Sequence, residues 1–269
     1  MLNNLRVVLM ISLFVVILSI EPEMAVGQSI NDSGDGTLRR IYVPILMYHY
    51  VSPLPENADP YRIELTVEPE IFRSHLQYLR HQGYQTISPY TLHNALNFGS
   101  PLPEKPIVLT FDDGYIDHYA FVFPMLREYG FIGTFFVITG HADEDHPDYL
   151  SWSQITEMAQ AGMQMEAHTR THRELTGRDT PFLVYEIVGS LQSLEAHTGM
   201  PTRIFAYPAG RYDDHTLRIL NSSPVLRAMT TRTGAFHTTD NAMEVQRLRV
   251  SGNMSPVELD HLLASNRWQ

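Results

Sequence analysis

The amino-acid sequence predicts an α/β fold in which parallel strands form one closed or nearly closed barrel. Short β-rich runs alternate with amphipathic helical patterns along most of the chain, which indicates parallel strands joined by crossover helices. The chain has 269 residues, 43% of them hydrophobic, so it can bury a large core and is too apolar to be disordered. The roughly 230 residues that follow the N-terminal segment suit one barrel better than two separate sheets.

About eight runs have the length and composition of buried strands. They cover residues 42–48, 84–87, 107–111, 134–138, 163–167, 203–207, 228–231 and 247–250. Helical patterns lie between most of these runs. Two examples are residues 69–81, whose apolar face contains Ile71, Phe72, Leu76 and Leu79, and residues 180–197, whose apolar face contains Phe182, Ile187, Leu191 and Leu194.

An apolar run covers residues 7–20 behind a single positive residue, Arg6. The run is shorter than the roughly 20 residues that span a bilayer, so it is typical of a signal peptide. Ala25 and Gly27 are small residues just before Gln28, which predicts cleavage after Gly27 and a signal peptide of residues 1–27. The alternatives are a retained membrane anchor and a buried N-terminal helix. We expect an exported protein, periplasmic, extracellular or attached to the cell envelope, that contacts the membrane only through this signal or anchor.

Residues 28–40 are expected to be a linker, because residues 31–37 are rich in Gly, Asp and Ser. The folded domain is expected to span residues 41–269. We find no internal repeat and no low-complexity tract in it.

Composition argues against several classes of function. The chain has 19 Lys and Arg against 30 Asp and Glu, so we expect no dense positive surface and no nucleic-acid partner. It has no Cys, which excludes disulfides, thiolate metal sites and cysteine nucleophiles. Any bound metal must therefore use His, Asp, Glu or water, and the 13 His residues gain importance.

Two adjacent carboxylates follow the apolar run at residues 107–111. Asp112 and Asp113 end this predicted strand and precede Gly114, and in a parallel barrel reactive side chains belong at the carboxyl ends of strands. Two carboxylates this close repel each other, so a bound cation or an arginine must lie nearby to keep both ionised. One of them can ligate a metal while the other stays free as a base.

The chain contains a second Asp pair, Asp213 and Asp214, in a different context. This pair lies in a polar turn and follows no buried strand. We expect it to cap the helix that starts near His215, which is a structural role.

Two histidines four residues apart follow the predicted strand at residues 163–167. On a helix, the spacing of His168 and His172 places both imidazoles on one face about 6 Å apart, close enough to meet one ion at about 2.1 Å. A solvated helical turn is the alternative. Together with one Asp, two His leave coordination positions open for water and substrate, as in a catalytic zinc site.

A tight turn follows the predicted strand at residues 203–207. It contains Pro208, Ala209 and Gly210. Taken alone it is an ordinary turn. In a barrel whose other strand ends hold a metal, the amides of Ala209 and Gly210 can donate hydrogen bonds to an oxyanion.

Three motifs occur in an order and at separations that resemble the polysaccharide deacetylase family, which contains the NodB homology domain and forms carbohydrate esterase family four. They are residues 110–114 (TFDDG), residues 168–175 (HTRTHREL) and residues 207–210 (YPAG). Residues 44–49 (PILMYH) and 150–152 (LSW) also resemble members of this family. The resemblance covers roughly residues 44–252, nearly the whole expected domain.

The resemblance implies a distorted (β/α) barrel of about seven parallel strands. It also implies a hydrolase that removes N-acetyl groups from an amino-sugar polysaccharide or oligosaccharide. By this match Asp112 is the catalytic base, while Asp113, His168 and His172 bind a divalent metal. Zinc is the expected ion, and cobalt and nickel suit these ligands about equally.

Two positions depart from the family pattern. Family members often have an arginine at the position of Ala206, which is thought to brace the base, and an acid histidine in the last motif, where residues 246–250 read QRLRV. Arg249 is the expected replacement for the guanidinium. His49, at the end of the first strand, is the expected replacement for the proton donor, although it can instead be a packed structural residue between two tyrosines.

Two other functions remain open at this stage. If neither replacement acts, a sugar-binding protein of the same fold with a weakened site is the alternative. Two His and one carboxylate are also the ligand set of iron oxygenases, but those sites usually lie in antiparallel β folds, whereas this chain alternates strands and helices. The sequence does not identify the polymer.

Overall fold

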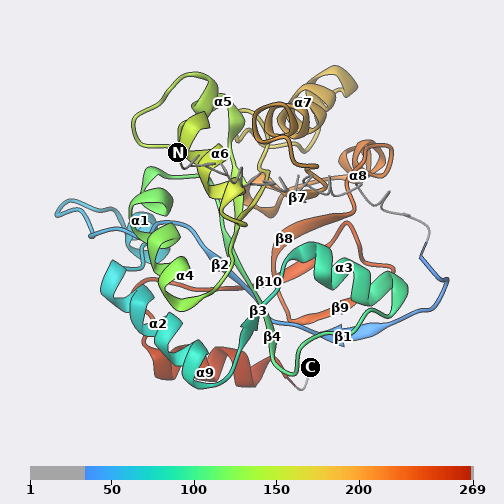
Figure 1. The fold of residues 1–269 in the computed structure, drawn as a ribbon. Helices are drawn as coiled ribbons and strands as arrows, with labels where there is room; N and C mark the ends of the chain where they lie inside the picture. Colours follow the sequence, from blue (N-terminus) through green and yellow to red (C-terminus); the bar gives the residue numbers. More distant parts are fainter. Residues whose placement is uncertain (1–33, 268–269) are drawn as a thin grey trace, which may run out of the picture. The chain divides into compact units, whose positions relative to one another are not determined.

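Parallel strands form a closed ring at the centre of the protein (Figure 1). The structure, a computed structural model, describes residues 34–267. The expected signal peptide, residues 1–27, and residues 28–33 of the expected linker lie outside the described residues. No helix within residues 34–267 is both long enough and apolar enough to span a membrane.

Ten strands are found in the described part of the chain. They are β1 (Arg40–Tyr42), β2 (Ile45–Tyr48), β3 (Gln85–Thr86), β4 (Pro106–Phe111), β5 (Thr134–Val137), β6 (Gln164–Ala167), β7 (Ile204–Ala206), β8 (Arg227–Thr233), β9 (Phe236–Thr238) and β10 (Val245–Arg249). The main sheet runs in the order β2-β10-β8-β7-β6-β5-β4-β3, and β2 also pairs with β4. This last pairing closes a ring of seven strands, from which β3 is left out.

All pairs within the ring are parallel. The distorted (β/α) barrel of about seven strands is therefore confirmed. The expected run at residues 84–87 is β3, which pairs in parallel with the first two residues of β4. The sequence patterns missed β1 and β9, because each has only three residues; they form a separate antiparallel pair.

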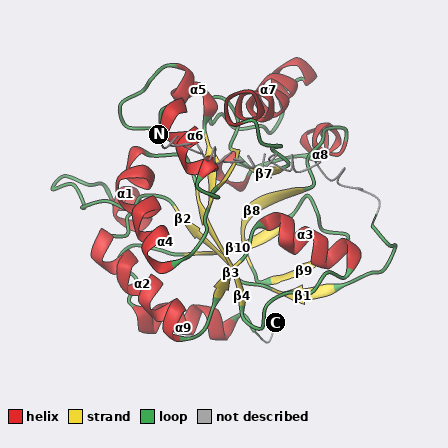
Figure 2. Ribbon diagram, in the orientation of Figure 1, coloured by secondary structure: helices red, strands yellow, loops and turns green. Residues whose placement is uncertain are grey.

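Helices surround the barrel (Figure 2). They are α1 (Pro60–Leu65), α2 (Pro69–His81), α3 (Pro89–Phe98), α4 (Phe123–Tyr129), α5 (Thr139–Asp143), α6 (Trp152–Gln160), α7 (Thr180–Thr198), α8 (Asp214–Asn221) and α9 (Pro256–Ser265). The two helices expected at residues 69–81 and 180–197 are confirmed as α2 and α7. Asp213 caps α8 by accepting a hydrogen bond from the Thr216 amide, as expected for the second Asp pair.

Each strand divides its side chains between two cores. Along β4, Val108 belongs to the cluster inside the barrel, whereas Leu109 and Phe111 belong to the cluster between the barrel and the helices. Because side chains alternate with a period of two, Asp112 is directed to the inside at the point where β4 ends. Leu92 and Leu96 of α3 pack into the interior cluster and complete its apolar part.

Candidate active site

The predicted site residues lie at or just beyond the carboxyl ends of parallel strands. Asp112 and Asp113 follow β4, His168 follows β6, and His49 follows β2. Because the strands are parallel, these ends meet on one side of the barrel. Residues far apart in the chain thus come together there.

Asp112 forms a two-pronged ion pair with Arg247 inside the barrel. Arg247 Nη1 donates to Asp112 Oδ1 and Nη2 donates to Oδ2, both at 2.7 Å. The guanidinium is fully buried, and it also donates to the Thr110 hydroxyl at 3.1 Å and to the Thr230 carbonyl at 3.0 Å. This geometry holds the Asp112 carboxylate in one orientation and gives it a strong counter-charge.

The guanidinium beside Asp112 belongs to Arg247, so the expectation for Arg249 is wrong. Both arginines lie on β10 two residues apart, so they share the same face of the strand. Arg249 is the last residue of β10, pairs with Met47 of β2 and is only half-buried. Arg247 lies two residues earlier on β10 and therefore deeper in the barrel. From this position its long side chain reaches Asp112. Sequence periodicity cannot separate two residues on the same face, which is why this arginine was missed.

His49 lies beside the same carboxylate. Its Nε2 is 3.9 Å from Asp112 Oδ2, and the residue is 9% exposed. Burial, with a smaller contribution from Arg249 and Arg247, lowers the pKa of His49 against the two aspartates, which raise it. The backbone at this position is held by His118, whose Nε2 is 2.6 Å from the His49 carbonyl oxygen. His49 is therefore within one small movement, or one bridging water, of Asp112.

Asp113, His168 and His172 converge on a single point. One ligand atom from each lies within 4.8 Å of the others, and both His168 Nε2 and His172 Nε2 are 3.3 Å from Asp113 Oδ1. That oxygen is buried and makes no hydrogen bond in the described structure. A buried carboxylate oxygen without a hydrogen bond is costly unless a cation lies beside it, so these three residues fit a divalent metal.

The tautomer of His168 supports the same interpretation. Its Nδ1 is 2.8 Å from the Ala206 carbonyl oxygen, which can only accept a hydrogen bond. His168 therefore donates from Nδ1, and Nε2 is directed toward Asp113. Metal-binding histidines are commonly fixed in this way by a carbonyl group on the opposite ring nitrogen.

The two histidines do not lie on a helix, which corrects the sequence-based expectation. His168 follows β6 directly, and the loop from there to α7 contains two left-handed residues, Thr169 with φ 66° and His172 with φ 56°. Asp113 is also left-handed, with φ 76°. Residues other than glycine rarely adopt this backbone conformation. Backbone strain of this kind concentrates at functional sites. The turns bring both imidazoles to Asp113, as the helical spacing also would have done.

Glu186 of α7 anchors this histidine loop from outside the barrel. Its Oε2 accepts the amides of Arg170 at 3.0 Å and Thr171 at 2.9 Å, and its Oε1 accepts the Thr171 hydroxyl. Glu186 is almost fully buried. It is a supporting residue that sequence reasoning missed, because its position 14 residues beyond His172 carries no signal of this contact.

The charges of the cluster favour a bound cation. Burial and the positive charge of His168 lower the pKa of His172 to about 4, so its imidazole is neutral at pH 7 and free to act as a ligand. Burial lowers the pKa of His168, but the negative charges of Asp113 and Asp112 raise it by more. The same negative charge attracts any cation to this position, whether a proton or a metal ion.

The ionisation of Asp112 also follows from its surroundings. Burial raises the pKa of Asp112, but the charge and hydrogen bonds of Arg247, together with smaller contributions from His168 and His49, lower it by more, so the net pKa lies below the ordinary value. The carboxylate is thus charged at neutral pH.

Ala209 lies in the tight turn that follows β7, on the same side of the barrel. The turn Pro208–Gly210 is a short 3-10 helix in which Ala209 has φ 52°. Gly210 is required there: its φ is 69°, and a Cβ would lie 2.1 Å from the Thr231 hydroxyl oxygen. The turn is therefore held in one shape against β8. No contact of the Ala209 amide tests the oxyanion role expected for it.

Comparison with known proteins agrees with this geometry. The profile of the family described as polysaccharide deacetylase matches residues 99–226. A Bacillus subtilis (strain 168) protein that carries the name of a polysaccharide deacetylase, YxkH, is 34% identical over 213 residues, which are 79% of this chain and 73% of YxkH. The chain belongs to the polysaccharide deacetylase family. It is accordingly a hydrolase that acts on carbon–nitrogen bonds other than peptide bonds.

Two further similarities extend the comparison within this family. The deacetylase PplD of Streptococcus pyogenes, solved in complex with acetate, superposes with a TM-score of 0.77 at 32% identity and covers 84% of this chain and 99% of PplD. The poly-β-1,6-N-acetyl-D-glucosamine N-deacetylase of Escherichia coli (strain K12) is 30% identical over 119 residues, 39% of this chain and 18% of that protein. The family resemblance stated from the motifs is thus confirmed.

Proposed function

We propose that this polysaccharide deacetylase removes N-acetyl groups from an exported amino-sugar polysaccharide in a metal-dependent reaction. One observation carries the proposal: three potential metal ligands, Asp113, His168 and His172, have ligand atoms within 4.8 Å of one another directly beside an ionised, unligated Asp112. This arrangement pairs a cation site with a neighbouring base. Such a pair is what amide hydrolysis requires.

Asp113, His168 and His172 are the residues that would hold the metal. Zinc is the ion we propose, and cobalt and nickel are also compatible with two imidazoles and one carboxylate. When bound, a divalent cation supplies Lewis acidity, which polarises a carbonyl group and lowers the pKa of water. The Nδ1 hydrogen bond of His168 to the Ala206 carbonyl keeps Nε2 available for this purpose.

Asp112 is the proposed general base. Its pKa lies below the ordinary value because of Arg247, so it is ionised and able to accept a proton from the attacking water. Arg247 occupies one lone pair of each carboxylate oxygen and leaves others for that proton. Arg247 therefore acts as a positioning residue for the base.

His49 is the proposed general acid, and the Ala209 amide is the proposed oxyanion donor. His49 Nε2 is 3.9 Å from Asp112 Oδ2, so a proton accepted by Asp112 has a short path to the imidazole. From there it can be delivered to the sugar nitrogen, which must be protonated before the amine leaves. The Ala209 amide would donate to the oxyanion of the tetrahedral intermediate.

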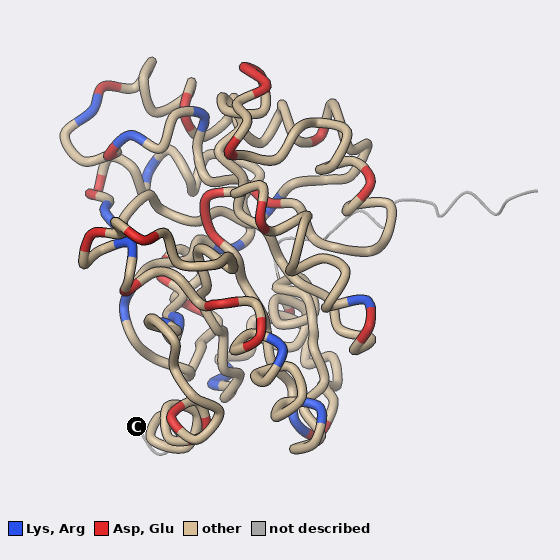
Figure 3. The backbone as a smooth tube through the Cα atoms, turned by 90° about the vertical axis from the view of Figure 1, so that its left-hand side faces the viewer, with Lys and Arg blue, Asp and Glu red and all other residues tan. Residues whose placement is uncertain are grey.

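The polymer is proposed to be a neutral N-acetylated glycan. Relatives named poly-β-1,6-N-acetyl-D-glucosamine N-deacetylase make β-1,6-linked N-acetylglucosamine the first substrate to test. Acidic and basic positions are interspersed along the described backbone (Figure 3). That nucleic acid is not a partner stays a prediction. Export through the N-terminal segment remains part of the proposal.

Alanine variants of the three ligands test the metal-dependent function. We expect Asp113→Ala, His168→Ala and His172→Ala to lose zinc binding and acetate release together. Zinc binding is measured by calorimetry, and acetate release is measured on a β-1,6-linked N-acetylglucosamine oligomer. A wild-type protein that binds the oligomer but releases no acetate with zinc, cobalt or nickel contradicts the proposal and favours a sugar-binding role.

A further inference from the structure

Residues 169–171, the part of the histidine loop between the two proposed metal ligands, are held from two sides. On one side the amide of Gly140, in α5, donates to the Arg170 carbonyl oxygen at 2.8 Å. A Cβ on Gly140 would clash with that oxygen, so only glycine permits this approach. On the other side Glu186 of α7 accepts the Arg170 amide at 3.0 Å. The backbone of the loop is therefore clamped between α5 and α7.

The side chain of Arg170 joins the same two helices. Its Nη2 donates to Asp143 Oδ2 of α5 at 2.6 Å, and its Nη1 donates to the Ser193 hydroxyl of α7 at 3.1 Å. The guanidinium carbon also lies 5.0 Å from the centre of the Tyr185 ring of α7, close enough for a cation–π contact. Arg170 therefore binds both helices through its side chain as well as its backbone.

The partner of Arg170 is itself fixed by a second donor. The other oxygen of Asp143, Oδ1, accepts the Nε1 hydrogen of Trp152 at 3.1 Å, and Trp152 is the last residue of the LSW motif. The Trp152 ring stacks on His197 of α7, with centroids 3.8 Å apart and planes at 3°. The side chains of Arg170 and Asp143 are only 24% and 33% exposed. This ion pair thus has less freedom than a pair on the open surface.

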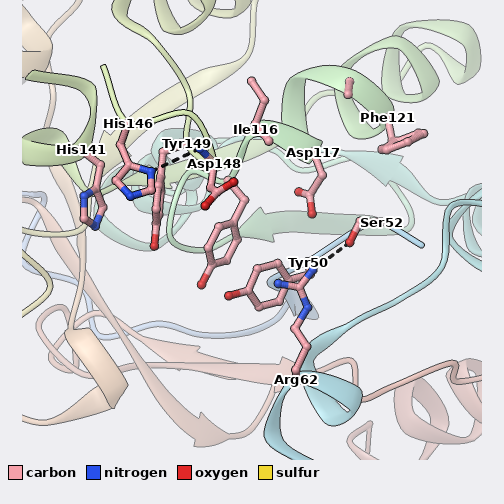
Figure 4. A pocket seen from close by; sticks show the side chains of 12 residues that line it. Tyr50, Ser52, Arg62, Ile116, Asp117, Phe121, His141, His146, Asp148 and Tyr149 are labelled. Carbon is pink, nitrogen blue, oxygen red and sulfur yellow. Dashed lines mark hydrogen bonds between the residues drawn. The ribbon is translucent and has the colours of Figure 1, made fainter. Parts of the chain in front are cut away.

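The segment that joins α5 to α6 is a firm support for this contact. The rings of His141, His146 and Tyr149 pack against one another, with centroids 4.0–5.3 Å apart, on one wall of a cavity of about 530 Å³ (Figure 4). The Leu150 amide donates to the Gly114 carbonyl oxygen at 2.9 Å. This bond ties the segment to the turn that follows β4, where the third proposed ligand lies.

The two histidines differ in how their rings are positioned. The His168 ring is buried, and its Nδ1 donates to the Ala206 carbonyl oxygen. The His172 side chain is 37% exposed, and no hydrogen bond fixes its Nδ1 in the described part of the chain. Both His172 and Thr169 are left-handed, a conformation that persists only where the surrounding structure holds it. The position of the His172 imidazole therefore depends on the loop that Arg170 anchors.

We propose that Arg170 is a positioning residue that holds the His172 imidazole in the metal site through its ion pair with Asp143. The inference rests on the proposed function, because it concerns the same metal site. Residues that orient metal ligands from outside typically change metal affinity or activity about 10- to 100-fold when they are replaced. The role requires a guanidinium, since the single ammonium of lysine cannot reproduce a planar fork that reaches Asp143 and Ser193 together.

The test measures metal affinity in the full chain without substrate. Arg170→Met keeps most of the side-chain volume but no donor, so we expect the Kd for zinc, measured by calorimetry with a competing chelator, to rise about tenfold. Arg170→Lys keeps the charge and is expected to raise this Kd about threefold. Adding Asp143→Asn to Arg170→Met should weaken zinc binding little further, because the two side chains act through one contact. The visible absorption of bound cobalt, which reports the arrangement of its ligands, is expected to change in Arg170→Met.

Arg73→Met is the matched control. Arg73 Nη1 donates to Glu128 Oε2 at 2.7 Å and its side chain is 31% exposed, so this pair resembles the pair of Arg170 and Asp143 but joins α2 to α4. We expect Arg73→Met to bind zinc within about twofold of the wild type and to leave the cobalt absorption unchanged. The control separates a loss of the metal site from a general loss of helix packing.

Wild-type zinc affinity in Arg170→Met, or an equal loss in Arg73→Met, overturns the inference. If Arg170→Met does not fold, Arg170→Lys decides, and an unchanged zinc Kd and cobalt absorption in that variant overturn it. A wild type that binds zinc but releases no acetate removes the proposed function, whereas the zinc affinities still decide the role of Arg170. A wild type that binds neither zinc, cobalt nor nickel overturns both.

Discussion

Two of the buried carboxyl groups, those of Asp112 and Glu166, are in opposite electrostatic states. Asp112, at the carboxyl end of β4, is 2% exposed, and Glu166, on β6, is 1% exposed. Asp112 is bonded to Arg247 at 2.7 Å through both oxygens, and its pKa lies below the ordinary value. Glu166 accepts the amides of Ile204 at 2.9 Å and Arg203 at 3.2 Å, and burial raises its pKa to about 8.

The difference shows that the partner, and not burial, decides the charge of each group. Both carboxyls lose their water, which by itself raises the pKa of each. A guanidinium with two hydrogen bonds reverses the effect at Asp112, whereas backbone amides do not reverse it at Glu166. A base must be ionised before it can accept a proton, and only Asp112 meets that requirement at pH 7.

Removing the charge of Asp112 gives the largest expected effect. Asp112→Asn keeps the shape of the side chain but cannot accept a proton, so we expect kcat for acetate release to fall by about 10³-fold, within the range for a lost general base. Zinc binding, measured by calorimetry, is expected to persist. The matched control is Asp214→Asn, from the second Asp pair, whose side chain lies in the first turn of α8. Turnover retained by Asp112→Asn removes the assignment of the base.

Replacing Arg247, the partner of Asp112, tests whether this ion pair sets the charge of the carboxylate. Arg247→Met leaves a buried carboxylate without its counter-charge, so we expect a loss of about 3–5 kcal/mol in the free energy of unfolding, read from urea denaturation. Acetate release is expected to fall with it. Arg249→Met is the matched control and is expected to cost less than about 1 kcal/mol. A larger loss for Arg249→Met than for Arg247→Met contradicts the pairing described here.

A buried histidine extends the comparison to a group that gains charge on protonation. His237 is fully buried, its Nε2 is 2.9 Å from the Val43 carbonyl oxygen, and burial lowers its pKa to about 4. The folded state binds this proton less readily than the unfolded state, whose pKa is about 6.5. His237 therefore stabilises the fold above pH 6.5, and this contribution is lost as the pH falls from about 6.5 to about 4.

We expect His237→Gln to remove up to about 3 kcal/mol of this pH dependence. The measurement is the free energy of unfolding at a series of pH values. His81→Gln, at an exposed position of α2, should leave the curve close to that of the wild type. An unchanged slope in His237→Gln shows that His237 is not the group responsible.

The smallest effect is expected at Glu166. Because its pKa is raised to about 8, the side chain is mostly protonated at pH 7, and Glu166→Gln replaces one neutral acceptor with another. We expect a change of less than about 1 kcal/mol in the free energy of unfolding, and acetate release within about twofold of wild type. A loss comparable to that of Arg247→Met shows that Glu166 is charged and that the contrast with Asp112 does not hold.

The fold and the broad position of the site were predictable from the sequence. Four of the ring strands, β2, β4, β5 and β7, are short and largely apolar. Reactive side chains are expected where parallel strands end, and Asp112, Asp113 and His168 come directly after β4 and β6. Period-two and period-3.6 patterns are local, and they were sufficient here because the elements alternate regularly.

Contacts that depend on how deep a residue lies in the barrel, or on the shape of a loop, could not be predicted from the sequence. Arg247 and Arg249 share one strand face, and only the tilt and packing of the closed barrel decide which one reaches Asp112. The histidine loop depends on left-handed turns at Thr169 and His172, which are rare outside glycine and asparagine and leave no mark in the pattern. The ring contact between Tyr50 and Tyr115, whose centroids are 3.8 Å apart, joins two segments that are far apart in the chain.

The ion pair between Asp112 and Arg247 joins positions 135 residues apart in the chain. Proteins are synthesised from the amino end at about 5–20 residues per second, so Asp112 leaves the ribosome roughly 10 s before its arginine does. Throughout that interval β10 is also missing, and the barrel has a gap between β2 and β8. The strand that seals the barrel is thus also the strand that supplies the counter-charge of the proposed base.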